Sequence, residues 1–157
     1  MQPELSLSVQ YATTAENLPR WRIRRWVQAA LRGLAHDLDP APARVALTLR
    51  LVDAEEGQAL NRDFRERDYA TNVLTFEYGI DPEGTAHGDI VLCLPVLQRE
   101  AQEQGKPLLD HAAHLIVHGT LHALGYDHLE CAEAEHMEAL ETAILHTLGI
   151  SDPYNQA

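Results

Sequence analysis

The feature that most restricts the fold is the stretch HGTLHALGYDH at residues 118–128. His118 and His122 are four residues apart, a spacing that puts two side chains on one face of a helix, one turn from each other. Gly125 follows, and glycine often ends a helix because it adopts a left-handed backbone at little cost. If the helix ends there, the chain can turn and bring His128 back toward the first two imidazoles. The spacing therefore predicts a helix end that gathers three histidines.

Three imidazoles on one ion suit a particular kind of metal site. They leave one tetrahedral position of zinc open for water or substrate, which is typical of a catalytic site. The spacing HxxxHxxGxxH equals that of the metzincin proteases, in which a glutamate after the first histidine is the general base. Gly119 stands at that position here. We therefore expect one zinc ion per chain on His118, His122 and His128, without the carboxylate that activates water in those proteases.

The apolar pattern predicts how the rest of the chain folds. Alternating apolar residues and short apolar runs predict strands near residues 5–9, 45–51, 71–78 and 89–95, with a turn-rich link at 80–88. Helical spacing, caps and breakers predict helices over about 19–34, 53–65, 96–103, 108–123 and 132–148. We expect one α+β domain over residues 1–157, with about four strands in a mixed sheet, four to five helices, and a metal site at the end of a long helix.

Charge and composition narrow the function classes. The formal net charge of -12 argues against a nonspecific, charge-driven nucleic-acid binder. It leaves room for a nucleic-acid enzyme, because exposed charges are screened over about 8 Å and a local basic groove can act. No apolar run approaches the ~20 residues of a membrane span. No signal-peptide pattern is present, and Cys93 and Cys131 form no disulfide framework. We expect a cytoplasmic protein with no membrane contact.

Two charged segments have simple structural interpretations. PRWRIRRW, residues 19–26, has four arginines and two tryptophans. These could contact RNA, but an amphipathic helix with Ile23 inward and the arginines in solvent is the simpler interpretation. The acidic segment near the C-terminus is expected to be a solvated helix face, and its glutamates are Glu130, Glu133, Glu135, Glu138 and Glu141. The two cysteines are expected to be small buried residues.

Several motifs together resemble one known family. HGTLHALGYDH is similar to the HGxLHLxGYDH signature of the YbeY family, bacterial endoribonucleases of ribosomal RNA maturation. Three further segments resemble family motifs in the same order: ALNRDFR at residues 59–65, TNVLTF at 71–76 and HGDI at 87–90. The departures from the family motifs are small: Ala123 stands where the family usually has leucine, and Thr75 stands where it often has serine.

The resemblance implies a function and a site. It implies a zinc-dependent endoribonuclease that prefers single-stranded RNA, acts in 3′-end maturation of small-subunit 16S rRNA and contributes to ribosome quality control. It places the zinc on His118, His122 and His128. The family's functional arginine falls on Arg65, and the resemblance therefore implies a catalytic role for it. A guanidinium suits that role because it can neutralise phosphate oxygens. Ribosomal RNA and the ribosome or small-subunit assembly proteins are the implied partners.

Two alternative functions and several residue roles stay open at this point. A metallohydrolase or protease on the same three histidines is disfavoured by Gly119. A noncatalytic zinc-containing ribosome-assembly factor is disfavoured by three ligands in place of four. The sequence does not choose between zinc-activated water and the substrate's 2′-OH as nucleophile, and it assigns no general base. It also leaves open the oligomeric state and the roles of His114, Asp89 and Asp127.

Overall fold

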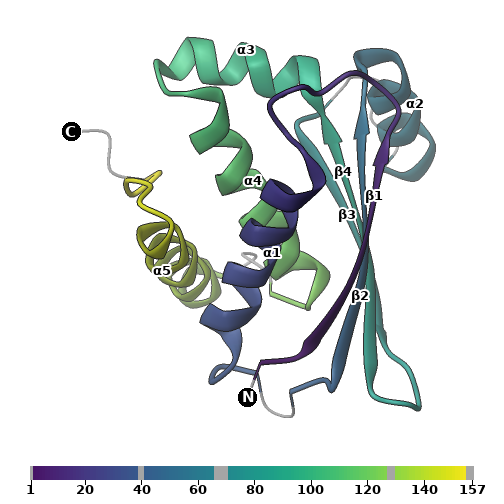
Figure 1. Ribbon diagram of the computed structural model, residues 1–157, viewed down its shortest axis with the longest axis vertical. Helices are drawn as coiled ribbons and strands as arrows, with labels where there is room; N and C mark the ends of the chain where they lie inside the picture. The colour runs from purple at the N-terminus through teal and green to yellow at the C-terminus, as the bar shows by residue number, and fades with distance from the viewer. Residues whose placement is uncertain (1, 39–40, 66–70, 127–129, 155–157) are drawn as a thin grey trace.

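The computed structural model describes residues 2–38, 41–65, 71–126 and 130–154. Over these residues, four strands and five helices follow one another along the chain (Figure 1). They are β1 (Glu4–Tyr11), α1 (Arg20–Leu34), β2 (Arg44–Val52), α2 (Ala54–Arg65), β3 (Val73–Ile80), β4 (Thr85–Cys93), α3 (Leu94–Gln104), α4 (Leu108–Ala123) and α5 (Cys131–Thr147). The predicted α+β class and the predicted element count are confirmed.

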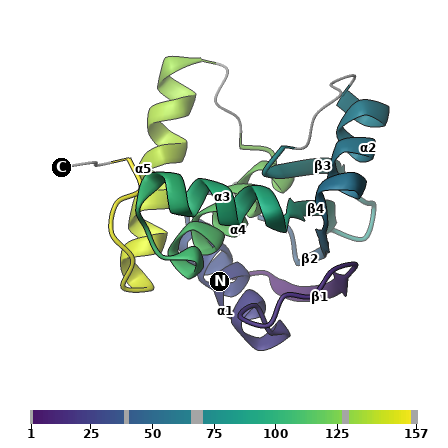
Figure 2. The same ribbon diagram turned by 90° about the horizontal axis from the view of Figure 1, so that it is seen from above.

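The strands form a mixed sheet in the order β1-β2-β4-β3. β1, β2 and β4 are parallel, and β3 pairs antiparallel with β4 at the edge. Figures 1 and 2 show α1, α4 and α5 on one side of the sheet and α2 on the other. No described helix combines the length and the apolar character that a bilayer crossing requires.

The main core lies between the sheet and α4. Leu49, Ile90, Ile116 and Leu121 are fully buried there, and α4 contacts α1, α3, α5, β3 and β4. A smaller apolar cluster on the opposite face of the sheet lies beneath α2 and α3; its buried members are Val52, Leu74, Val91, Cys93 and Val96. The long helix that carries the histidine motif is therefore the central helix of the molecule.

Two glycines let α4 lie unusually close to β4. A Cβ atom added at Gly119 would lie 3.0 Å from Cγ2 of Ile90, and one added at Gly88 would lie 2.9 Å from Cβ of Ala123. Glycine permits such a close approach because it carries no side chain. Gly119 therefore has a packing role. A larger side chain at the position that holds the general base in metzincins would require Ile90 to shift.

The end of α4 is as expected. Gly125 has a φ of 100°. Its N–H donates to the carbonyl of His122 over 3.0 Å, and the N–H of Tyr126 donates to the carbonyl of Leu121 over 3.0 Å. These are the two hydrogen bonds of a Schellman motif. The predicted helix end near Gly125 is confirmed.

Other local predictions were confirmed or need correction. Asp53 caps α2 as expected, since its Oδ1 accepts a hydrogen bond from the N–H of Glu56 over 2.9 Å. β4 begins at Thr85, inside the segment expected to be a link, because parallel pairing with β2 extends the strand backwards. It ends at Cys93, because Pro95 lies in the first turn of α3, where proline is favoured. The expectation that Cys131 is buried was wrong, since it is exposed at the start of α5.

The close packing of α4 on β4 can be tested by a substitution at Gly119. We expect Gly119→Glu to lower the free energy of unfolding by about 3 kcal/mol or more, because a charged side chain would be forced against Ile90. Urea unfolding followed by circular dichroism measures this. Asp110→Glu, in the half-exposed first turn of α4, is the control and should stay within about 0.5 kcal/mol. Wild-type stability of Gly119→Glu would contradict the packing.

Candidate active site

A pocket lies where α4 meets the edge strand β3. Its volume is about 380 Å³, and the lining residues come from the end of α2, from β3 and the residue before it, and from α4; they are Arg65, Asn72, Val73, Leu74, Thr75, Glu77, His118 and His122. Two of the three predicted zinc ligands and the predicted catalytic arginine thus share one pocket. The third predicted ligand, His128, and the neighbouring Asp127 lie outside the described residues.

The alternation of side chains along β3 builds one wall of this pocket. Val73 packs against the main core beside α4, whereas Leu74 and Phe76 belong to the apolar cluster on the other face. Successive side chains of a strand point to opposite faces, so Thr75 and Glu77 share the α4 side with Val73. Leu74, Phe76 and Tyr78 therefore share the face away from the histidines.

The two histidines of α4 lie side by side in the pocket. The ring centroids of His118 and His122 are 4.5 Å apart, with the planes at 73°. Both side chains are half-buried. The predicted arrangement of two imidazoles on one helix face is confirmed, and it is the arrangement by which a helix offers two nitrogens to one metal ion.

A buried carboxylate from α5 holds the first of these histidines. Glu141 is fully buried, and its Oε1 accepts a hydrogen bond from Nδ1 of His118. Its Oε2 accepts from the Tyr154 hydroxyl and, over 3.3 Å, from Nε2 of His114. Burial by itself would raise the pKa of Glu141, but the hydrogen bonds from His114, His118 and Tyr154 outweigh it and lower this pKa to about 2. The carboxylate is therefore ionised at neutral pH.

The hydrogen bond to Glu141 decides how His118 can act. A proton on Nδ1 places the lone pair of the ring on Nε2, and a carboxylate partner fixes the ring in one orientation. The nitrogens of His114 and His118 and an oxygen of Glu141 lie within 4.8 Å of one another and could themselves hold a cation. Because both oxygens of Glu141 already accept hydrogen bonds, we assign it to orienting His118. The residues present fit a metal on the His122 side of His118.

Arg65 is fixed at the rim of the pocket. Its Nη2 donates to the carbonyl of Thr75 over 2.6 Å, and its Cζ lies 5.1 Å from the ring centroid of Phe76. These two contacts hold the last residue of α2 against the edge strand. Arg62, on the same helix, is exposed and pairs with Asp63 over 3.3 Å.

The chain just before the undescribed residues 127–129 is anchored away from the sheet. The Tyr126 hydroxyl donates to Asp37, which follows α1, and Nε2 of His136 on α5 lies 3.0 Å from the same carboxylate. The hydrogen bond from Tyr126 is the largest cause of a lowered pKa of Asp37. The motif residue Tyr126 thus ties the turn after α4 to both flanking helices.

The structure shows what two residues of open role contact, and it corrects one expectation. His114 contacts Glu141, the carboxylate that also holds His118. Asp89 lies on the other face of the sheet and accepts a hydrogen bond from Tyr78 over 2.8 Å, so its role is structural. The expectation that Glu141 belongs to a solvated face was wrong. Its spacing could have revealed this, because it falls between Met137 and Ile144 in the apolar stripe of α5.

The fold and the site define a class: an α+β protein with a candidate metal site at the end of its central helix, facing an arginine across a pocket. The family model described as Endoribonuclease YbeY matches residues 8–149. The chain belongs to this family, and the predicted resemblance is confirmed.

Relatives agree with this assignment, and a solved structure agrees with the fold. The chain is 66% identical over 154 residues to Endoribonuclease YbeY of Bordetella pertussis, with 98% of each chain covered. It is 53% identical to Endoribonuclease YbeY of Thiobacillus denitrificans, with 99% of each covered. A solution structure of a Thermotoga maritima protein superposes with a TM-score of 0.56 at 20% identity, covering 94% of this chain and 99% of that one. That likeness supports the fold.

Removing the charge of Glu141 tests its assignment. We expect Glu141→Gln to weaken zinc binding by about 10- to 100-fold, because the amide no longer fixes the His118 ring as an ionised acceptor. Titration against a fluorescent zinc chelator measures the affinity. Glu138→Gln, an exposed position on the same helix, is the matched control. Equal zinc affinity in both variants would rule out the orienting role.

Proposed function

We propose that the protein is an endoribonuclease whose site consists of one zinc ion on His118, His122 and His128, with Arg65 as the catalytic arginine. The observation that carries this proposal is the shared pocket of Arg65, His118 and His122. Membership of a family described as endoribonucleases supports the reaction. Imidazole nitrogens support zinc as the metal.

The proposed substrate is single-stranded ribosomal RNA, cleaved during 3′-end maturation of 16S rRNA and during ribosome quality control. Proteins of the ribosome or of small-subunit assembly are the proposed partners. The pocket lies at a sheet edge, where a flexible single strand can bend its backbone inward. A paired RNA helix holds its phosphates on a more rigid surface. This placement supports a preference for single strands.

The residues of the chain have distinct tasks in this proposal. When bound, a zinc ion supplies Lewis acidity at the scissile phosphate. Glu141 keeps the His118 ring in one orientation and one tautomer. Arg65 neutralises the charge that develops on the non-bridging phosphate oxygens. Its guanidinium has five N–H donors, so it can hold the carbonyl of Thr75 and still donate to phosphate.

A protease mechanism on the same histidines is disfavoured. The glutamate that such a mechanism requires is replaced by Gly119. A side chain at this position would also press on Ile90, since its Cβ atom would lie 3.0 Å from Cγ2 of Ile90.

Substitutions at the pocket test the proposal. We expect Arg65→Ala to retain zinc and to lower kcat on a single-stranded RNA reporter by about 100-fold or more, because charge stabilisation is lost. We expect His122→Ala to lose both zinc and cleavage. Reporter kinetics and metal analysis of the same preparations give the two readouts.

Arg62→Ala is the matched control, since Arg62 is an exposed arginine on the same helix. It should cleave like the wild type. Full cleavage by Arg65→Ala and His122→Ala would show that the activity does not arise at this site. Retained zinc in His122→Ala would overturn the ligand assignment.

A further inference from the structure

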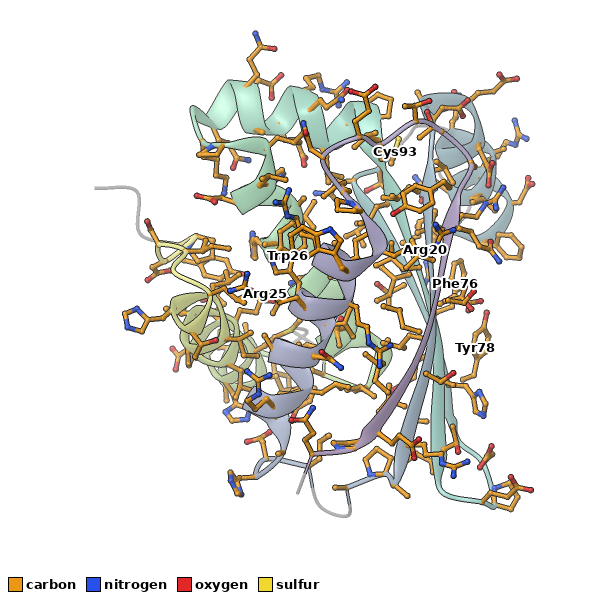
Figure 3. All side chains as sticks on the ribbon, viewed as in Figure 1. Arg20, Arg25, Trp26, Phe76, Tyr78 and Cys93 are labelled. Atoms are coloured by element: carbon orange, nitrogen blue, oxygen red, sulfur yellow. The ribbon has the colours of Figure 1, made fainter. Side chains whose placement is uncertain are left out.

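Large aromatic side chains gather on the face of the sheet that the helices α1, α4 and α5 leave open. Phe64 at the end of α2 is 60% exposed, and Tyr78 on β3 is 62% exposed. Phe76 also lies on β3, two residues before Tyr78. Its ring meets that of Phe64 edge-on, with the ring centroids 5.6 Å apart. Figure 3 shows Phe76 and Tyr78 on the side of the sheet away from α1. We call these three residues the aromatic platform.

The platform is held in place by its surroundings. The partly buried side chain of Phe76 packs on the apolar cluster beneath α2. The Tyr78 hydroxyl donates to Oδ2 of Asp89 over 2.8 Å, which fixes the ring beside β4. Ring positions that are fixed before binding lose little conformational entropy when a ligand stacks on them.

The platform is continuous with the pocket. Arg65 lines the pocket together with the two histidines, and its Cζ also lies 5.1 Å from the centroid of Phe76. One arginine therefore belongs to both surfaces. A strand with its phosphate at Arg65 has its neighbouring nucleotides within reach of the aromatic rings around the edge of β3.

We propose that the aromatic platform is a base-binding subsite for the RNA strand that flanks the cleaved phosphate. This proposal rests on the proposed endoribonuclease function. Exposed aromatic rings bind single strands by stacking on bases, and this contact tolerates any base. It also suits a chain with a net charge of -12, because stacking adds affinity without a large basic surface.

The experiment compares variants that lose a ring with variants that keep it. Phe64→Leu combined with Tyr78→Leu removes both exposed rings but keeps apolar side chains. Phe64→Tyr with Tyr78 unchanged keeps both rings and the hydrogen bond from Tyr78 to Asp89. Trp21→Leu is the matched control, because Trp21 is 60% exposed on α1, in the other layer. Phe76 stays unchanged because it also supports the fold.

Cleavage kinetics are measured on two single-stranded RNA reporters, one with all bases and one with abasic nucleotides beside the cleavage site. We expect the double leucine variant to raise KM for the complete reporter about tenfold with little change in kcat. On the abasic reporter it should match the wild type. The ring-retaining variant and Trp21→Leu should behave like the wild type on both.

Several results would overturn the subsite. They are an unchanged KM in the double leucine variant, an equal rise in Trp21→Leu, or the same loss on both reporters. A dimer of the wild type that the leucine changes dissociate would show that a second copy covers the platform. If the wild type cleaves and the double leucine variant has the same KM as the wild type, the subsite alone is ruled out. If the wild type neither binds nor cleaves RNA, the proposed function is ruled out as well.

Discussion

The buried carboxylate of Glu141 is the group around which the site is organised. An ionised carboxylate in the interior is costly unless hydrogen bonds compensate for its lost hydration. Here His118 and His114 of α4 and Tyr154 beyond α5 supply those hydrogen bonds. The same contacts fix α5 against α4 and fix the first histidine of the motif. One interaction thus serves both the packing of two helices and the chemistry of the pocket.

The side of α4 that faces the sheet packs closely on β4 because two residues at this contact are glycines. Gly119 and Gly88 bring the helix close to β4, and the edge strand β3 then lies opposite the two histidines. Arg65 reaches the same space because the end of α2 is tied to β3 through the carbonyl of Thr75. The pocket is therefore assembled from three elements that are distant in sequence. Arg65 thus gives this acidic protein a cation beside the two histidines.

Much of the fold could be predicted because its signals are local. The histidine spacing and Gly125 predicted α4 and its end, and alternating apolar residues predicted the strands. The beginning of β4 at Thr85 was missed because it depends on pairing with β2, which no local pattern encodes. The place of Arg65 came from resemblance, since its distance to the histidines depends on the sheet order. Glu141 was grouped with exposed glutamates by charge, although its position in the apolar stripe of α5 indicated burial.

The most direct test of the account is the position of the metal, measured by anomalous diffraction from crystals of the zinc-loaded protein. We expect zinc at about 2.0–2.1 Å from Nε2 of His118 and from a ring nitrogen of His122, while Nδ1 of His118 still donates to Glu141. An ion bound to an oxygen of Glu141 and to His114 would contradict it, because Glu141 would then be a ligand and not the group that orients one.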